Sequence, residues 1–127
     1  MHKKVFITGA TAGFGEACAR KFAAEQYDVI ITGRRAERLL KLKDELEQTN
    51  GVSVLPLSFD VQDRRQVFDA IRQMPEEWQQ IDVLINNAGL ALGREYFDEA
   101  DIDEWETMID TNVKGLLYVS RALLPFF

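Results

Sequence analysis

The chain has 127 residues, 46% of them hydrophobic and 28% charged, a composition that predicts a single folded domain over residues 1–127 rather than a disordered chain. Its net charge of −6 argues against nucleic acid or anionic membranes as partners, and because no apolar run approaches the ~18 residues of a bilayer span, we expect a cytoplasmic protein. With one cysteine and one histidine, the sequence supports neither a disulfide framework, nor a zinc site, nor a serine–histidine hydrolase.

Strand and helix patterns alternate along the chain. Apolar and β-branched runs predict strands at residues 4–7, 28–32, 52–59 and 82–86. Helical periodicity predicts helices at residues 16–23 and 36–49, from about residue 63, and from about residue 101 to the last residues. Pro56 favours an edge position for the third strand, because proline donates no ladder hydrogen bond.

The two later helices carry recognisable start signals. Asp63 and Gln66 have the spacing of a capping box, and Asp101 with Glu104 repeats it. The apolar stripe of the last helix predicts a buried face made of Trp105, Met108, Ile109, Asn112, Leu116, Val119 and Leu123.

Strands separated by helices predict a parallel sheet covered on both faces, since each parallel connection needs a crossover and crossovers are right-handed. We therefore expect a Rossmann-like doubly wound α/β fold with strand order 3-2-1-4, truncated after four strands and followed by one long helix. The glycine-rich stretch 8–15, Asp60 and residues 86–89 then share the carboxyl edge of the sheet, where such folds bind ligands.

The stretch Thr8-Gly9-Ala10-Thr11-Ala12-Gly13-Phe14-Gly15 lies between the first strand and the first helix. Gly9 permits the turn, Gly13 the approach of a phosphate to the backbone, and Gly15 the packing of helix on sheet. A helix N-terminus offers free N–H groups and a positive dipole end to that phosphate. The alternative is a tight turn without a ligand.

Two arginines follow the second strand, where an NAD-binding protein carries an acidic residue for the ribose. Arg34 and Arg35 stand there, with Arg38 one turn later. Guanidinium groups suit a ribose 2′-phosphate, so the sequence favours NADP over NAD. The alternative is a solvated basic start to a helix, which is the wrong helix end for cations.

Three polar positions remain open to two interpretations each. Asp60 could accept a hydrogen bond from an adenine amino group or cap a loop, and Asn86 with Asn87 could simply stabilise a turn. Asn112 falls on the expected buried face, where its amide needs a partner, supplied either by the backbone or by a functional group.

Taken together, these motifs resemble the short-chain dehydrogenases/reductases. The resemblance rests on Thr8-Gly9-x-x-x-Gly13-x-Gly15, Asp60-Val61, Asn86-Asn87-Ala88-Gly89 and Thr111-Asn112-Val113-Lys114-Gly115. The wording of residues 9–16, 87–93 and 105–112 resembles the branch of NADP-dependent 3-hydroxy acid (serine or allo-threonine) dehydrogenases.

The resemblance implies hydride transfer between NADP(H) and a hydroxy acid or other small alcohol or carbonyl compound. It assigns the pyrophosphate to Gly9, Ala10, Thr11, Ala12, Gly13, Phe14 and Gly15. It assigns the 2′-phosphate to Arg34 and Arg35, adenine to Asp60 and Val61, and the adenosine side to Asn87. It places Asn112 in the catalytic tetrad, where it anchors a water of the proton relay.

The chain departs from the family in one motif. The family's general acid/base belongs to a Tyr-x-x-x-Lys motif, but the residues four places after Tyr27, Tyr96 and Tyr118 are Ile31, Ala100 and Ala122. We therefore expect residues 1–127 to be the N-terminal part of a dinucleotide-binding Rossmann domain, about half of the enzyme. Without the family's catalytic Ser, Tyr and Lys, we expect no turnover by the lone chain. The alternatives are a non-catalytic NADP-binding fragment and an oligomeric remnant without ligand.

An unpaired fourth strand and exposed apolar residues on the last helix, such as Leu117, Tyr118 and Leu124, predict a homo-oligomer formed through that helix or the strand edge.

Overall fold

The computed structural model describes residues 2–89 and 98–127. Four strands form one parallel sheet: β1 (Lys4–Ile7), β2 (Asp28–Gly33), β3 (Val54–Ser58) and β4 (Val83–Ile85). The spatial order is β3-β2-β1-β4, which confirms the predicted order. Pro56 lies on the edge strand β3, opposite Ile31 of β2, as its missing N–H requires.

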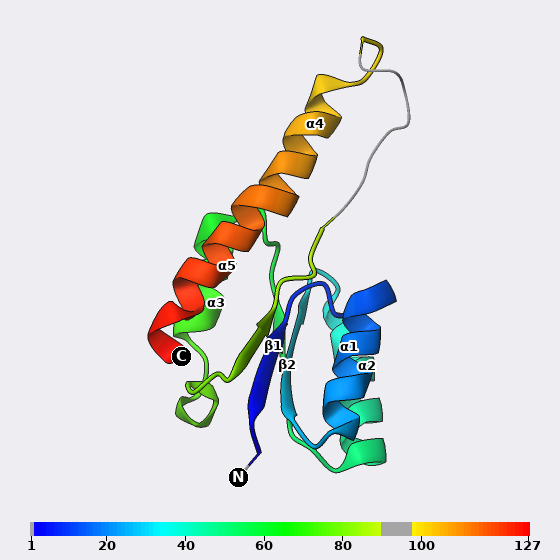
Figure 1. Ribbon diagram of the computed structural model, residues 1–127, viewed down its shortest axis with the longest axis vertical. Helices are drawn as coiled ribbons and strands as arrows, with labels where there is room; N and C mark the ends of the chain where they lie inside the picture. The colour runs from blue at the N-terminus through cyan, green and yellow to red at the C-terminus, as the bar shows by residue number, and fades with distance from the viewer. Residues whose placement is uncertain (1, 90–97) are drawn as a thin grey trace.

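Helices cover both faces of the sheet (Figure 1). On one side lie α1 (Gly13–Ala24) and α2 (Ala36–Asn50). On the other lie α3 (Arg64–Arg72) and α5 (Leu116–Leu123). The fold is therefore the predicted Rossmann-like, doubly wound one, and β3 and β4 are each shorter than their sequence patterns suggest.

Alternation along the central strands builds two cores. Val5 and Ile7 of β1 pack with buried residues of α1 and α2. Phe6, between them in sequence, points to the opposite face and packs with residues of α3 and α5. Because successive side chains of a strand point to opposite faces, a four-residue strand anchors both helical layers.

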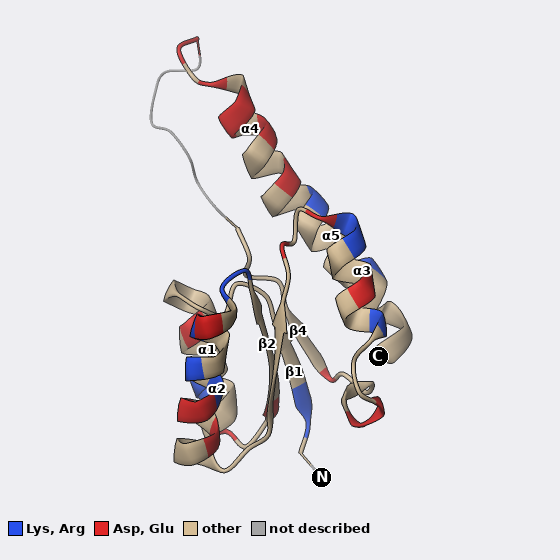
Figure 2. Ribbon diagram, turned by 180° about the vertical axis from the view of Figure 1, so that it is seen from behind, with Lys and Arg blue, Asp and Glu red and all other residues tan. Residues whose placement is uncertain are grey.

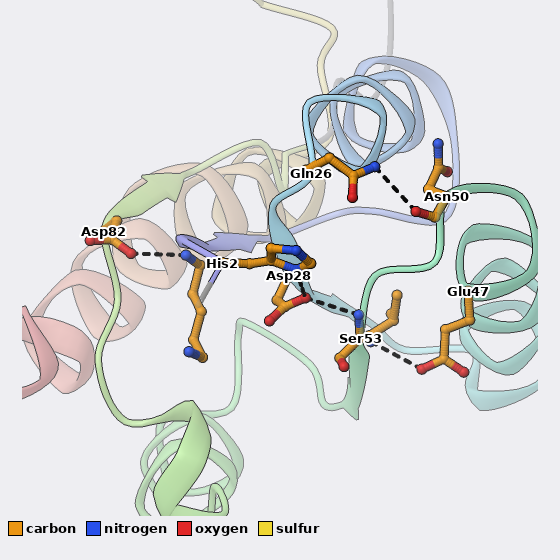
Figure 3. Close-up of polar contacts among 9 residues, drawn as sticks. His2, Gln26, Asp28, Glu47, Asn50, Ser53 and Asp82 are labelled. Carbon is orange, nitrogen blue, oxygen red and sulfur yellow. Dashed lines mark hydrogen bonds and ion pairs between the residues drawn. The ribbon is translucent and has the colours of Figure 1, made fainter.

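Carboxylates fix the amino ends of the strands (Figure 3). Asp82 accepts a 2.8 Å hydrogen bond from the Lys4 N–H and donates its own N–H to the Lys4 carbonyl. Asp28 accepts from the Ser53 N–H at 2.9 Å, with His2 Nδ1 3.0 Å from the same oxygen. These contacts hold strand starts in register at the edge opposite the carboxyl ends.

A continuous helical run follows residue 101, as predicted. Asp101 caps it by accepting from the Asp103 N–H. The run consists of α4 (Ile102–Ile109), η2 (Asp110–Gly115), α5 and the short turn η3 (Leu124–Phe126). Its α4 end projects beyond the sheet, whereas α5 lies beside α3 (Figure 1). A further short turn, η1 (Glu76–Trp78), precedes β4.

The predicted buried face of this helical run is partly wrong. Val119 and Leu123 are buried as expected, but Ile109, Asn112 and Leu116 are exposed. Thr111 and Gly115 are buried instead. Ile109 belongs to α4, which projects beyond the sheet and has no buried residue. The change from Asn112 to Thr111 falls in η2, a π-helix, in which i→i+5 hydrogen bonds place more residues in each turn than the 3.6 that the sequence pattern assumes.

Candidate functional site

A cleft of about 320 Å³ opens at the carboxyl ends of the strands. It is lined by Gly9, Thr11, Ala12, Thr32, Gly33, Arg34, Arg35, Phe59, Asp60, Val61, Asn87, Ala88, Gly89 and Thr111. The cleft thus gathers most of the predicted site residues from four separate loops. Ala10, Gly13, Phe14, Gly15 and Asn112 belong to the same segments but do not line it.

The glycine loop has an open side and a packed side. Gly13 begins α1 with φ +56°, and a Cβ built there would meet no atom within 4 Å, so the N-terminal turn of α1 is open to a ligand. Gly15 is packed: a Cβ there would overlap the Gly9 carbonyl oxygen and lie 2.6 Å from Asn87 Nδ2. Ala10 is fully buried, and Phe14 is 84% exposed.

The end of β4 is bonded to the end of β1. The Thr8 hydroxyl oxygen accepts the N–H groups of Asn87 and Ala88, both at 2.9 Å. The Asn87 side-chain amide donates to the Gly9 carbonyl at 3.1 Å. Asn86 turns the other way and donates to the Ser120 hydroxyl of α5. Asn87 therefore stabilises the glycine loop as well as its own turn.

The two arginines lie beside this loop. Arg34 and Arg35 connect β2 to α2 and are both exposed, and a Cβ on Gly33 would lie 3.1 Å from Thr11 Cγ2. Within the described part of the chain, the ion pairs involve other residues. Figure 2 shows basic residues, in blue, where β2 meets α2, and acidic residues, in red, along α4. The cleft therefore has a cationic wall whose charges are available to an anion.

Asp60 shapes its own loop and faces the cleft. Its Oδ1 accepts from the Gln62 N–H at 2.9 Å, while Asp63 is the N-cap of α3 and accepts from the Gln66 N–H. The predicted Asp63–Gln66 cap is confirmed. Val61 packs beneath the π-helix, because a Cβ on Gly115 would lie 2.9 Å from the Val61 Cβ.

Asn112 lies against the loop that follows β4. A Cβ on Gly89 would lie 3.0 Å from Asn112 Oδ1, so the predicted catalytic residue is beside the site although its side chain is exposed. Two threonines of the quoted motifs, to which the sequence assigned no role, also contribute: Thr8 beside the glycine loop and Thr111 in the cleft lining. The hydrogen bonds that Thr8 accepts follow from no local pattern, and Thr111 is buried in the π-helical η2.

The described residues also limit other kinds of site. Outside residues 1 and 90–97, no group of three or more His, Cys, Asp or Glu side chains is arranged to hold a metal ion. Over the same residues, no helix has the length and apolar character of a membrane span. The cleft at the sheet edge is the arrangement that unites the predicted residues.

The glycine loop, the arginines and the cleft occur in a chain that matches a known family over almost its whole length. The family described as short chain dehydrogenase matches residues 3–127. The chain belongs to this family. The resemblance drawn from the glycine loop, Asn86-Asn87-Ala88-Gly89 and the helix with Asn112 is thereby confirmed.

Several relatives within the family are close. NADP-dependent 3-hydroxy acid dehydrogenase YdfG of Salmonella typhi is 54% identical over 121 residues, covering 95% of this chain and 47% of the relative. Serine dehydrogenase of Escherichia coli superposes with a TM-score of 0.89 at 50% identity, over 97% of this chain and 55% of the other. A closed form of serine dehydrogenase complexed with NADP+ gives 0.86 at 50% identity, over 97% and 48%. The chain spans about half the length of the curated relatives it matches.

Proposed function

We propose that residues 1–127 form the NADP(H)-binding part of a short-chain dehydrogenase acting on a hydroxy acid or another small alcohol or carbonyl compound. The observation that carries the proposal is the cleft that joins the glycine loop to Arg34 and Arg35. The names of the relatives, an NADP-dependent 3-hydroxy acid dehydrogenase and a serine dehydrogenase bound to NADP+, support it.

The residues present fit such a cofactor. The N-terminal turn of α1 is uncovered at Gly13, which suits a pyrophosphate because the helix dipole and the free N–H groups favour an anion there. In our proposal Arg34 and Arg35 bind the 2′-phosphate by charge-assisted hydrogen bonds. Asp60, Val61 and Asn87 border the adenosine.

When bound, the cofactor supplies a hydride at C4 of its nicotinamide. In our proposal Asn112, beside Gly89, positions a water near the reacting end. These residues do not supply the family's general acid/base, since the 127 residues contain no Tyr-x-x-x-Lys pair. We therefore propose that this polypeptide by itself binds the cofactor without turnover, and the second candidate is a purely non-catalytic NADP-binding or oligomerising fragment. A cytoplasmic location and a homo-oligomeric state remain predictions.

Cofactor choice tests the proposal. NADPH and NADH are titrated into the 127-residue chain by isothermal calorimetry, with the wild type, Arg34→Ala, Arg35→Ala and, as a control, Arg65→Ala on α3. We expect the wild type to prefer NADPH and each cleft variant to lose about tenfold in NADPH affinity, while NADH binding and the control stay unchanged. A wild-type preference for NADH would contradict the assignment.

Turnover separates the two candidates. NADPH oxidation is followed with small carbonyl substrates, using chain that is shown to bind NADPH in the same preparation. We expect binding without oxidation. Steady oxidation by these 127 residues would contradict the non-catalytic expectation and require an acid/base group that the family motif does not identify.

A further inference from the structure

Thr111 is a buried polar residue of the cleft lining, and its hydroxyl oxygen has almost no solvent-accessible surface. Thr111 is 6% exposed and lines the cleft. Its Oγ1 has no hydrogen-bond partner within residues 2–89 and 98–127. The other two buried threonines differ, because Thr8 accepts two backbone N–H groups and Thr32 donates to the Ile7 carbonyl.

The helix itself does not satisfy this hydroxyl. Thr107, one turn earlier in α4, donates to the Asp103 carbonyl at 2.9 Å, which is the usual way in which a helical threonine finds an acceptor. Thr111 lies in the π-helical η2 and makes no such bond. A buried hydroxyl without a partner is unfavourable, and π-helical segments are frequent at functional sites.

The position of Thr111 assigns it to one end of the cleft. Gly115, four residues later on the same buried face, packs directly on Val61, and Val61 and Asp60 line the cleft together with Thr111. In the proposed function this is the end that holds the adenosine. Adenine offers ring nitrogens that accept and an amino group that donates, and a hydroxyl can pair with either.

We propose that Thr111 Oγ1 is a cofactor-binding contact to the adenosine half of NADP(H). This inference rests on the proposed function and adds to it a residue on the last helical run. The π-helical winding then has a binding consequence, because it turns Thr111 toward the cleft in place of Asn112.

Adenosine 2′,5′-bisphosphate tests the inference, because it contains the adenosine and the 2′-phosphate but no nicotinamide. Its affinity is measured by calorimetry on the wild type, Thr111→Val, Thr111→Ser and the control Thr107→Val. We expect Thr111→Val to bind about three- to tenfold more weakly, the worth of one hydrogen bond. Thr111→Ser keeps the hydroxyl and should bind as the wild type does, as should Thr107→Val.

The melting temperature is a second measurement, and it should not fall in the variant whose ligand affinity falls. Valine has nearly the shape of threonine and removes a buried hydroxyl without a protein partner, so the melting temperature of ligand-free Thr111→Val should equal or exceed that of the wild type. Weaker binding by a variant that is at least as stable cannot be attributed to unfolding.

Each other outcome overturns the inference. Equal affinity of Thr111→Val and the wild type removes the contact, and equal losses in Thr111→Val and Thr111→Ser indicate packing rather than the hydroxyl. If Thr111→Val binds NADPH more weakly but the bisphosphate as tightly as the wild type does, Thr111 contacts the nicotinamide half instead. If the wild type binds neither ligand, the proposed function fails as well; if it binds both, only the inference is at stake.

Discussion

The side-chain amide of Asn87 donates a 3.1 Å hydrogen bond to the carbonyl oxygen of Gly9, although 78 positions separate the two residues. The same carbonyl lies against Gly15, the third glycine of the loop. The loop between β1 and α1 is therefore held from both sides by the fold itself. A phosphate-binding loop that is held before the ligand arrives loses less conformational entropy on binding.

Replacing Thr8 by valine should destabilise this junction. Thr8 is 2% exposed and its hydroxyl oxygen accepts the N–H groups of Asn87 and Ala88. Valine removes this acceptor from both, and the Asn87 N–H keeps only its 3.1 Å hydrogen bond to the Ile85 carbonyl. We expect the free energy of unfolding, measured by urea denaturation, to fall by about 1–3 kcal/mol. Thr8→Ser keeps the oxygen and is the matched control. A Thr8→Val variant as stable as Thr8→Ser would show that water replaces both bonds.

Replacing Gly15 by alanine should act on stability and binding together. The new Cβ would overlap the Gly9 carbonyl oxygen, so the helix or the loop must move, and we expect a loss of about 1–3 kcal/mol with weaker NADPH binding. Gly51→Ala is the control, because Gly51 ends α2 with φ +69° and open space around it. That variant should cost about 1 kcal/mol and leave NADPH affinity unchanged. Equal effects on affinity would contradict the role of close packing at Gly15.

The sequence predicted those features that depend on neighbouring residues. The edge position of β3 with Pro56 and the caps Asp63 and Asp101 follow from local composition and spacing, and the structure confirms them. The strand order, also confirmed, follows from the doubly wound class that the alternation of strands and helices indicates. The buried face of the last helix depends on how tightly that helix is wound. The spacing of its apolar residues fits 3.6 residues per turn. This spacing does not predict the π-helical turn in which Thr111 is buried.

The site residues divide in the same way. Glycines after a strand and arginines after the next strand are visible in the sequence, because their chemistry and order carry the signal. The bond from Asn87 to Gly9 and the two bonds accepted by Thr8 depend on the pairing of β4 with β1. Such contacts become visible only when the strands are assembled, since no spacing in the chain encodes them.

The stability of the sheet edge should depend on pH through Glu47. Its carboxylate accepts the Val54 N–H at the start of β3 and lies 2.7 Å from Lys43 Nζ. The Lys43 hydrogen bond is the main cause that holds the pKa of Glu47 below its ordinary value, and the Val54 N–H adds to it. A lowered pKa means that the stabilisation is complete above the ordinary glutamate pKa and is lost as the pH falls through the lowered one.

Glu47→Gln removes that titration. Near neutral pH we expect the variant to be less stable by about 0.5–1 kcal/mol, because the ion pair is partly exposed. The difference should shrink as urea unfolding is repeated at acidic pH and vanish below the lowered pKa. Asp44→Asn, an exposed position on the same helix, is the control. A stability difference that stays constant with pH would contradict the linkage.

The last helical run should make the 127-residue chain associate. Large apolar residues on it are exposed, namely Ile102, Ile109, Val113, Leu116, Leu117, Leu124 and Phe127. Leu117 and Leu124 are 57% and 61% exposed, and several large apolar side chains exposed along one helical run favour an interaction surface there. In light scattering at micromolar concentration we expect a mass above the 14.5 kDa of one chain.

Charge substitution identifies the surface responsible. The double variant Leu117→Lys/Leu124→Lys should shift the scattering mass toward one chain, since two buried cations would oppose contact between apolar faces. Leu40→Lys, which alters a similarly exposed leucine on α2, should leave the mass unchanged. If the double variant associates as the wild type does, the open edge of β4 becomes the contact to test, because an unpaired strand edge is a template for pairing. A wild-type chain that is strictly monomeric would refute association through either surface.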